Sequence, residues 1–265
     1  MNPVVVKIGG STLGEHDTTI HDLVRLQVLG FPVVVVHGGG NTISEWLEKQ
    51  GITTEFVEGL RVTTPESLNV AVAVLAGLIN KQIVAELARQ GGRVVGISGA
   101  DASLLSGETF DERLGLVGSV TQVDTSVLHI FLDHGLIPVV APVAIENADG
   151  HVSDSGLLNL NADTAAAHIA IGLNASKLVF LTDVPGILDG EDNLLEEVGI
   201  RRGKELLSSG VVTRGMIPKV EACMNALTNR IESHIVDGRA NGALFSLVAE
   251  SSERPKGTVF METDE

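Results

Sequence analysis

Residues 4–10 read VVVKIGG and residues 33–40 read VVVVHGGG, and these two segments indicate the fold. Each is a run of mostly β-branched residues that ends in glycines. Continuous apolar runs, rather than alternating ones, are typical of strands covered on both faces, as in a parallel sheet. The strands expected on this pattern are residues 4–8, 32–37, 93–98, 137–143, 177–182 and 234–236.

Segments with helical periodicity separate these strands. They are residues 18–29, 42–50, 65–90, 124–134, 161–173, 202–209, 216–229 and 242–249. Alternation of strands and helices predicts an α/β fold with a mostly parallel central sheet. Residues 53–62 and 102–123 break the pattern, because turn residues separate short strand-like runs, and both are expected to form β-hairpins.

Composition limits the partners and the compartment. The chain of 265 residues carries 18 Lys and Arg against 34 Asp and Glu, a net charge of −16. Such a charge disfavours non-specific binding to nucleic acid or to an anionic membrane. Cys223, the single cysteine, cannot form an internal disulfide or a Cys-rich zinc site. The first residues lack a signal peptide and the apolar run 68–80 is too short to span a bilayer, so a cytoplasmic protein is expected.

Glycine clusters follow three of the expected strands, at residues 9–10, 38–40 and 96–99. Ligands of open α/β sheets bind beyond the carboxyl ends of the strands, where glycines let the backbone N–H groups approach an anion. One such cluster alone would be read as a tight turn, but three together favour a phosphate or carboxylate site. The chain has no P-loop, no G-x-G-x-x-G dinucleotide motif and no H-E-x-x-H metal motif.

Several polar residues stand where a site would need them. Lys7 lies in an apolar strand, where its ammonium needs an anionic partner unless the side chain extends to solvent. Lys219 opens an apolar helical face, although alone it would be an ordinary surface lysine. Asn159 and Asn161 alternate before a helix, so their amides can grip a ligand from one side or cap that helix. Asp163 follows in the first turn, where its carboxylate could bind lysines.

These segments together resemble the amino-acid kinase family. The resemblance is carried in chain order by residues 6–10, 36–40, 59–63, 80–81, 116–118, 159–163, 181–188 and 215–219. It implies a three-layer αβα sandwich with β-hairpin insertions. It also implies one domain over residues 1–265, with an amino-acid-binding lobe over about 1–175 and an ATP-binding lobe over about 176–265. The motifs GLRVT at 59–63 and NLNAD at 159–163 are more specific to members that act on N-acetylglutamate.

The resemblance implies an activity, which is transfer of the ATP γ-phosphoryl group to the side-chain carboxylate of N-acetyl-L-glutamate, the second step of arginine biosynthesis. Lys7 and Lys219 would stabilise the transferring group and Asp163 would orient both lysines. The acetylated amino acid would be bound by Gly38, Gly39, Arg61, Asn159 and Asn161. ATP would be bound by Gly9, Gly10, Asp183, Val184, Pro185, Gly186, Ile187, Leu188, Val211, Val212 and Thr213.

The resemblance also sets expectations about cofactors and assembly. Mg²⁺ would enter with ATP and be held mainly by the phosphates, so no metal-binding residue is assigned. Members that arginine inhibits carry an N-terminal extension, and Lys7 lies too near the first residue for one, so a homodimer without arginine feedback is expected. Asn41 departs from the proline common after the glycine triplet, and residues 151–158 look longer than usual.

Two other functions remain open on the sequence. The chain could be a kinase of a related acidic amino acid, such as carrier-linked aminoadipate or glutamate, or a non-catalytic amino-acid sensor of the same fold. Arg61 within the GLRVT motif and the lack of an obvious basic docking surface favour the acetylated substrate. The presence of Lys7, Asp163 and Lys219 favours a catalyst over a sensor.

Overall fold

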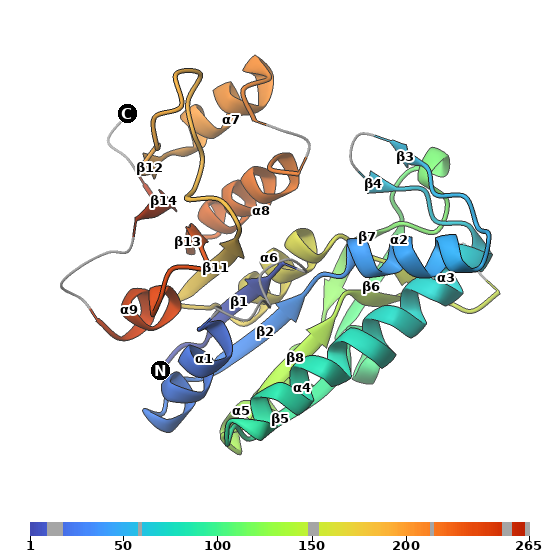
Figure 1. The fold of residues 1–265 in the computed structure, drawn as a ribbon, viewed down its shortest axis with the longest axis horizontal. Coiled ribbons are helices and arrows are strands. Elements are labelled where there is room, and N and C mark those ends of the chain that lie inside the picture. Colours follow the sequence, from blue (N-terminus) through green and yellow to red (C-terminus); the bar gives the residue numbers. More distant parts are fainter. Residues whose placement is uncertain (10–17, 58–59, 148–153, 213–214, 251–255, 263–265) are drawn as a thin grey trace.

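An eight-stranded sheet forms the centre of the molecule in the computed structural model, which describes residues 1–9, 18–57, 60–147, 154–212, 215–250 and 256–262 (Figure 1). Its strand order is β12-β14-β13-β11-β1-β2-β8-β5, and the six strands from β13 to β5 are parallel. The bounds are β1 Val4–Ile8, β2 Val33–His37, β5 Val94–Ser98, β8 Ile137–Ala141, β11 Lys177–Thr182, β12 Glu197–Val198, β13 Glu232–Asp237 and β14 Gly257–Phe260.

Helices cover both faces of this sheet, because successive side chains of each buried strand point in opposite directions. Val5 and Val34 pack into the apolar core of one face, whereas Val4 and Val33 pack into the other. The first face is covered by α5 Ser126–Asp133, α6 Ala162–Gly172, α7 Ile200–Ser209 and α8 Ile217–Thr228. The second is covered by α1 Thr19–Val28, α2 Gly40–Lys49, α4 Asn80–Arg89 and α9 Ala243–Ala249. The expected αβα sandwich is confirmed.

A second, four-stranded sheet extends the molecule beyond the carboxyl end of β8. Its strand order is β10-β9-β6-β7. The bounds are β6 Leu105–Thr109, β7 Gly118–Val123, β9 Val143–Glu146 and β10 Leu157–Asn159. Two short helices, η2 Asp101–Ser103 and η3 Glu112–Leu114, flank β6. The hairpin expected over 102–123 is present as β6 and β7. The end predicted for the strand over 137–143 was wrong, because β8 ends at Ala141 and Val143 belongs to the next strand, β9. A separate two-stranded sheet pairs β3 Phe56–Val57 with β4 Leu60–Arg61, as expected for 53–62.

One long helical rod, Pro65–Arg89, runs along the second face of the central sheet (Figure 1). Thr64 caps it by accepting a hydrogen bond from the Ser67 N–H at 3.2 Å. Its middle, η1 Ala73–Ile79, has the wider turns of a π-helix and joins α3 Pro65–Val72 to α4. By length and composition alone the rod could cross a membrane, unlike the shorter run 68–80. Its residues Val74 and Ile83 are buried in the core, so it serves here as a core helix.

Candidate active site

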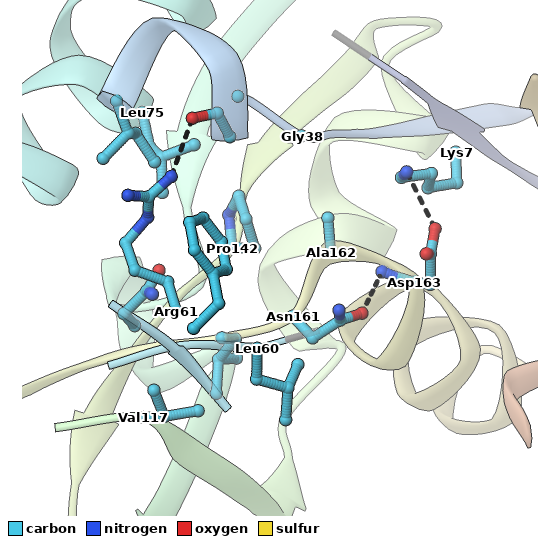
Figure 2. Close-up of a pocket in the computed structure, with 16 residues that line it drawn as sticks. Lys7, Gly38, Leu60, Arg61, Leu75, Val117, Pro142, Asn161, Ala162 and Asp163 are labelled. Atoms are coloured by element: carbon cyan, nitrogen blue, oxygen red, sulfur yellow. Dashed lines mark hydrogen bonds and ion pairs between the residues drawn. The ribbon is translucent and has the colours of Figure 1, made fainter. Parts of the chain in front are cut away.

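The site lies at the carboxyl edge of the parallel strands. Ile8 of β1 is in register with His37 of β2 and with Leu181 of β11, so the residues that follow these strands meet at one edge. A cavity of about 250 Å³ opens there (Figure 2). Its lining includes seven residues singled out in the sequence, namely Lys7, Gly38, Gly39, Arg61, Asn159, Asn161 and Asp163.

Three charged side chains from distant parts of the chain meet at one end of the cavity. The Asp163 carboxylate lies 2.8 Å from Lys7 Nζ through Oδ1 and 3.1 Å from Lys219 Nζ through Oδ2. Lys7 comes from β1, Asp163 from the first turn of α6 and Lys219 from the first turn of α8. Lys219 Nζ also donates to the Gly215 carbonyl oxygen at 3.2 Å. One carboxylate therefore holds two ammonium groups side by side.

The protonation state of Asp163 follows from these contacts. Burial alone would raise the pKa of its carboxyl, but the charges of Lys7 and Lys219 and their hydrogen bonds outweigh burial and lower that pKa below its ordinary value. Asp163 is thus ionised at neutral pH. Two ammonium groups against one carboxylate leave this end of the cavity with one surplus positive charge, in a chain whose net charge is −16.

Two helix N-termini add to the positive character of the cavity. The helices α2 and α6 begin at Gly40 and Ala162, and both residues line the cavity. The first N–H groups of a helix have no partner within it and carry the positive end of the helix dipole. The cavity therefore favours an anionic ligand.

Arg61 occupies the opposite end of the cavity from Lys7 and Asp163 (Figure 2). Its Nη2 donates to the Gly40 carbonyl oxygen at 2.9 Å and to Ser44 Oγ at 2.8 Å, and its guanidinium lies 4.8 Å from the Phe56 ring centroid. Only 8% of Arg61 is exposed, and among the described residues its Nη1 has no hydrogen-bond partner. Burial lowers the pKa of the guanidinium, although arginine stays charged in proteins. A buried Nη1 without a partner is the donor that a ligand carboxylate would complete.

Asn159 and Asn161, for which the sequence left helix capping and ligand contact open, make different hydrogen bonds. The Asn161 carboxamide oxygen caps α6, accepting from the N–H groups of Asp163 at 2.9 Å and Thr164 at 3.1 Å. Its amide oxygen is therefore taken by the helix, and only its NH₂ group remains for a ligand. Asn159 lies at the end of β10 and its Nδ2 donates to Thr63 Oγ1 at 3.3 Å. Both residues line the cavity, so capping and ligand contact are compatible.

The three glycines of the triplet differ in how closely they are packed. The Gly38 N–H donates to the Ile8 carbonyl oxygen at 3.0 Å, so this N–H is not free for a ligand. At Gly39 a Cβ atom would overlap Ile79 Cδ1 and approach Leu75 Cδ2 to 2.9 Å, so a larger residue would force these side chains to shift, whereas a Cβ at Gly40 would meet nothing within 4 Å. Gly9 follows β1 at the same edge, whereas Gly10 lies outside the described residues.

Part of the set of residues assigned to ATP follows β11 at this edge. Asp183 follows β11, and the exposed side chains of Val184 and Val211 lie in the segments assigned to the nucleotide. Ile187 is buried, and its N–H donates to Thr258 Oγ1 at 2.8 Å. Gly186 has a φ of 152°, and a Cβ there would lie 2.6 Å from the same Oγ1. Val212 is buried, and Thr213 lies outside the described residues.

Sequence reasoning missed the apolar wall of the cavity. Ile43, Leu60, Leu75, Val117, Pro142 and Leu160 line it beside the charged groups. Nothing in these residue types distinguishes them from ordinary core residues. Ser44 was also missed, although its position one turn into the helix after the glycine triplet is a usable signal.

Known proteins of similar sequence and structure identify the family of this chain. The family model described as "Amino acid kinase family" matches residues 2–237. The chain belongs to the amino acid kinase family. Curated members include an acetylglutamate kinase of Dehalococcoides mccartyi, 40% identical over 97% of this chain and 94% of the relative, and one of Synechococcus sp., 44% identical over 94% and 85%. A crystal structure of smu.665 from Streptococcus mutans has a TM-score of 0.83 at 26% identity and covers 98% of both chains. With its similarity to these acetylglutamate kinases, the chain is a kinase of this family and uses ATP.

Proposed function

We propose that this chain transfers the γ-phosphoryl group of ATP to the side-chain carboxylate of N-acetyl-L-glutamate, giving N-acetyl-L-glutamyl 5-phosphate for arginine biosynthesis. The observation that carries the proposal is the layout of the cavity. A buried guanidinium with a partnerless Nη1 lies at one end and two lysines joined by Asp163 lie at the other. A ligand with two carboxylates satisfies both ends. The names of the curated relatives agree with this substrate.

Phosphoryl transfer to a carboxylate requires positioning of the two substrates rather than a general base. The attacking carboxylate is already ionised at neutral pH, so no proton has to be removed. The barrier arises from bringing two anions together and from the charge on the phosphoryl oxygens during transfer. Lys7 and Lys219 meet this need, since their ammonium groups are fixed by Asp163 before the substrates bind. Fixed charges of this kind stabilise a transition state without reorganising.

Specificity for the acetylated substrate is assigned to the middle of the cavity. Arg61 would take the α-carboxylate, and the NH₂ groups of Asn159 and Asn161 would face the acetamide. The apolar wall, which includes Leu60 and Val117, would contact the acetyl methyl group. A free α-ammonium would meet this wall unpaired, and burying an unpaired charge is costly. Glutamate itself is therefore expected to bind poorly.

ATP is assigned to the adjoining edge, over Gly9, Asp183–Leu188 and Val211–Val212. Exposed Val184 and Val211 suit an adenine ring, and the adjacency of β1 and β11 brings this segment beside Lys7. Mg²⁺ would enter with ATP and neutralise phosphate charge, held mainly by the phosphates. The described residues contain no group of three or more His, Cys, Asp or Glu side chains that could hold a metal ion by themselves. The amino-acid lobe would then end near residue 175 and the ATP lobe would begin near 176.

Assembly as a cytoplasmic homodimer completes the proposal. The Pro65–Arg89 rod is apolar, yet only 44% of its most apolar window is buried in one chain. The neighbouring edge strand β5 is partly exposed at all five residues. Association of two chains over this rod and edge would remove apolar surface from water. Light scattering after gel filtration should then give twice the 27.8 kDa of one chain, and a monomer at micromolar concentration would contradict this part.

The substrate is tested by measuring ADP release with N-acetyl-L-glutamate, L-glutamate, L-aspartate and L-2-aminoadipate. We expect turnover with the acetylated substrate and little with the free amino acids. Arg61→Met should raise the KM for N-acetyl-L-glutamate about tenfold or more, because it removes a charged donor to a carboxylate. Arg201→Met is the matched control, since the Arg201 side chain is 64% exposed and lies outside the cavity and the Pro65–Arg89 rod. Turnover only with a free amine would overturn the proposed substrate.

A further inference from the structure

A polar cluster of three residues, of which His37 and Asn80 are buried and Lys81 is exposed, adjoins the glycine triplet and takes no part in the steps above. It consists of His37, the last residue of β2, and of Asn80 and Lys81 at the start of α4. His37 is 1% exposed and Asn80 is fully buried. Asn80 and Lys81 form one of the motifs of the resemblance, but no substrate contact is assigned to them. Their hydrogen bonds connect the long helix to the floor of the cavity.

The orientation of the Asn80 amide is fixed by its neighbours. Lys81 Nζ can only donate, and it lies 3.0 Å from one amide atom, which must therefore be the oxygen. The other amide atom lies 2.9 Å from the Val139 carbonyl oxygen and 3.1 Å from that of Ile97, which can only accept. This atom is therefore the nitrogen. Gly96 makes the arrangement possible, because a Cβ there would lie 2.8 Å from Lys81 Nζ and would overlap the Asn80 amide oxygen.

The Gly38 carbonyl oxygen determines the tautomer of His37. It lies 3.0 Å from Nδ1 and can only accept, so the proton of a neutral ring must sit on Nδ1. Nε2 is then bare and lies 3.4 Å from Asn80 Nδ2, whose two hydrogens are directed to the Val139 and Ile97 carbonyl oxygens. Burial lowers the pKa of His37 to about 4, the hydrogen bond to Gly38 opposes this shift, and the charges of Lys7 and Lys81 add to it. The ring is therefore neutral at physiological pH.

The Gly38–Gly39 peptide unit connects the His37 ring to the cavity. The carbonyl oxygen and the following N–H of a trans peptide point in opposite directions, and the described residues contain no cis peptide bond. His37 draws the Gly38 carbonyl oxygen to the buried side, so the Gly39 N–H points away from the ring and toward the cavity that both glycines line. A ring with its proton on Nε2 would repel that oxygen and release the peptide.

We propose that His37, buried beside Asn80 as the neutral tautomer with its proton on Nδ1, is a positioning residue that fixes the Gly39 N–H as a donor to the acidic substrate. The proposal rests on the proposed function for the identity of that substrate. His37 itself does not line the cavity, so it acts through the Gly38–Gly39 peptide. Losing the donor would weaken substrate binding while the nucleotide site stays intact.

The first test needs no substrate and is made on the whole protein. Histidine labelled with ¹⁵N is examined by long-range proton–nitrogen correlation, and His37→Asn identifies the signals of residue 37. Between about pH 6 and 8, where an ordinary histidine titrates, we expect a protonated Nδ1 and a bare Nε2 throughout. A proton on Nε2, or a doubly protonated ring in this range, would overturn the proposal even if the enzyme works as proposed.

The second test separates positioning from general packing by a matched pair. Asn can place an amide N–H where His37 has Nδ1–H, whereas Leu fills a similar space without a donor. In calorimetry, His37→Leu should weaken N-acetyl-L-glutamate binding about tenfold or more and leave ATP binding within about twofold, with His37→Asn within about threefold of the native chain for both. Equal loss of both ligands in both variants, or native binding by His37→Leu, would refute the positioning role. A native chain that binds no N-acetyl-L-glutamate would instead refute the proposed function, and the tautomer measurement would then decide the inference.

Discussion

Replacing Asp163 by Asn is the sharpest perturbation of the site, because it keeps the shape of the side chain and removes only its charge. In the native chain the side chains of Lys7, Asp163 and Lys219 are 8%, 7% and 16% exposed. An amide in place of the carboxylate would leave two nearly buried ammonium groups without an anion. Both the stability of the fold and the rate of phosphoryl transfer should fall.

The size of the stability loss follows from the distances. At an effective dielectric constant of about 20, charges separated by 2.8 and 3.1 Å attract each other by about 5 to 6 kcal/mol per pair. The cost of taking the three groups out of water offsets much of this gross attraction. Truncating one partner of a buried ion pair costs about 3 to 5 kcal/mol, and we expect Asp163→Asn to lower the free energy of unfolding by that amount.

Denaturant titration and steady-state kinetics measure the two effects. The loss should shrink when Lys7→Met is added to Asp163→Asn, because one of the stranded charges is then gone. The turnover number kcat should fall about 10²–10³-fold in Asp163→Asn, in the range found when one preorganised charged donor is lost. Stability losses that add to within about 0.5 kcal/mol in the double variant would refute the coupling through charge. A native kcat in Asp163→Asn would refute the role of Asp163 in orienting the lysines.

Three further outcomes are expected. Lys7→Ala and Lys219→Ala should each lower kcat about 10²–10³-fold, far more than they alter the denaturation midpoint, and near-native turnover in both would contradict their role. Gly39→Ala should cost about 1 to 3 kcal/mol of stability by overlap with Leu75 and Ile79, whereas Gly40→Ala, where a Cβ meets nothing within 4 Å, should be near neutral in the same titration. The His234 hydrogen bond lowers the pKa of Glu232 to about 2, against burial and with help from Lys177, so its stabilisation is present above the unfolded pKa of about 4 and is lost as the pH falls toward 2. Glu232→Gln should therefore differ from the native chain in denaturation midpoint at pH 7 and converge with it near pH 2, and a constant gap would contradict this.

Much of the fold could be predicted, because buried parallel strands have a strong sequence pattern. The runs at 4–8 and 33–37 are uniformly apolar, and both form central strands as expected. The strand β14 was missed, since Gly257–Phe260 is short and polar at its start. The expected strand at 234–236 is present as β13, but its pairing with β14 is a contact that no local pattern contains. The continuation of β8 into β9 was missed because Val143 is as apolar as the residues before it. Pro142, which has no N–H to donate to a strand partner, was the local signal that β8 ends at Ala141.

The candidate site was predictable where a residue conflicts with its surroundings. Lys7 stands out because an ammonium in an apolar strand demands a partner. The sequence around Asn161 allowed either a helix cap or a ligand contact. In the structure the same side chain caps α6 and lines the cavity, so both interpretations apply. Arg61 and Ser44 meet through two elements separated in sequence, a contact that no local pattern contains. The sequence therefore identifies the isolated charged residue, whereas its partner can be identified only from the three-dimensional structure.

The π-helical middle of the long rod affects how the rod tolerates a deletion. A π turn takes up about one residue more than an α turn, so deleting one residue within Ala73–Ile79 lets this segment wind as an α-helix with Asn80 still beside His37. An α-helix turns by about 100° per residue, so the same deletion within α3 would rotate the whole following segment by that angle and carry Asn80 away from His37.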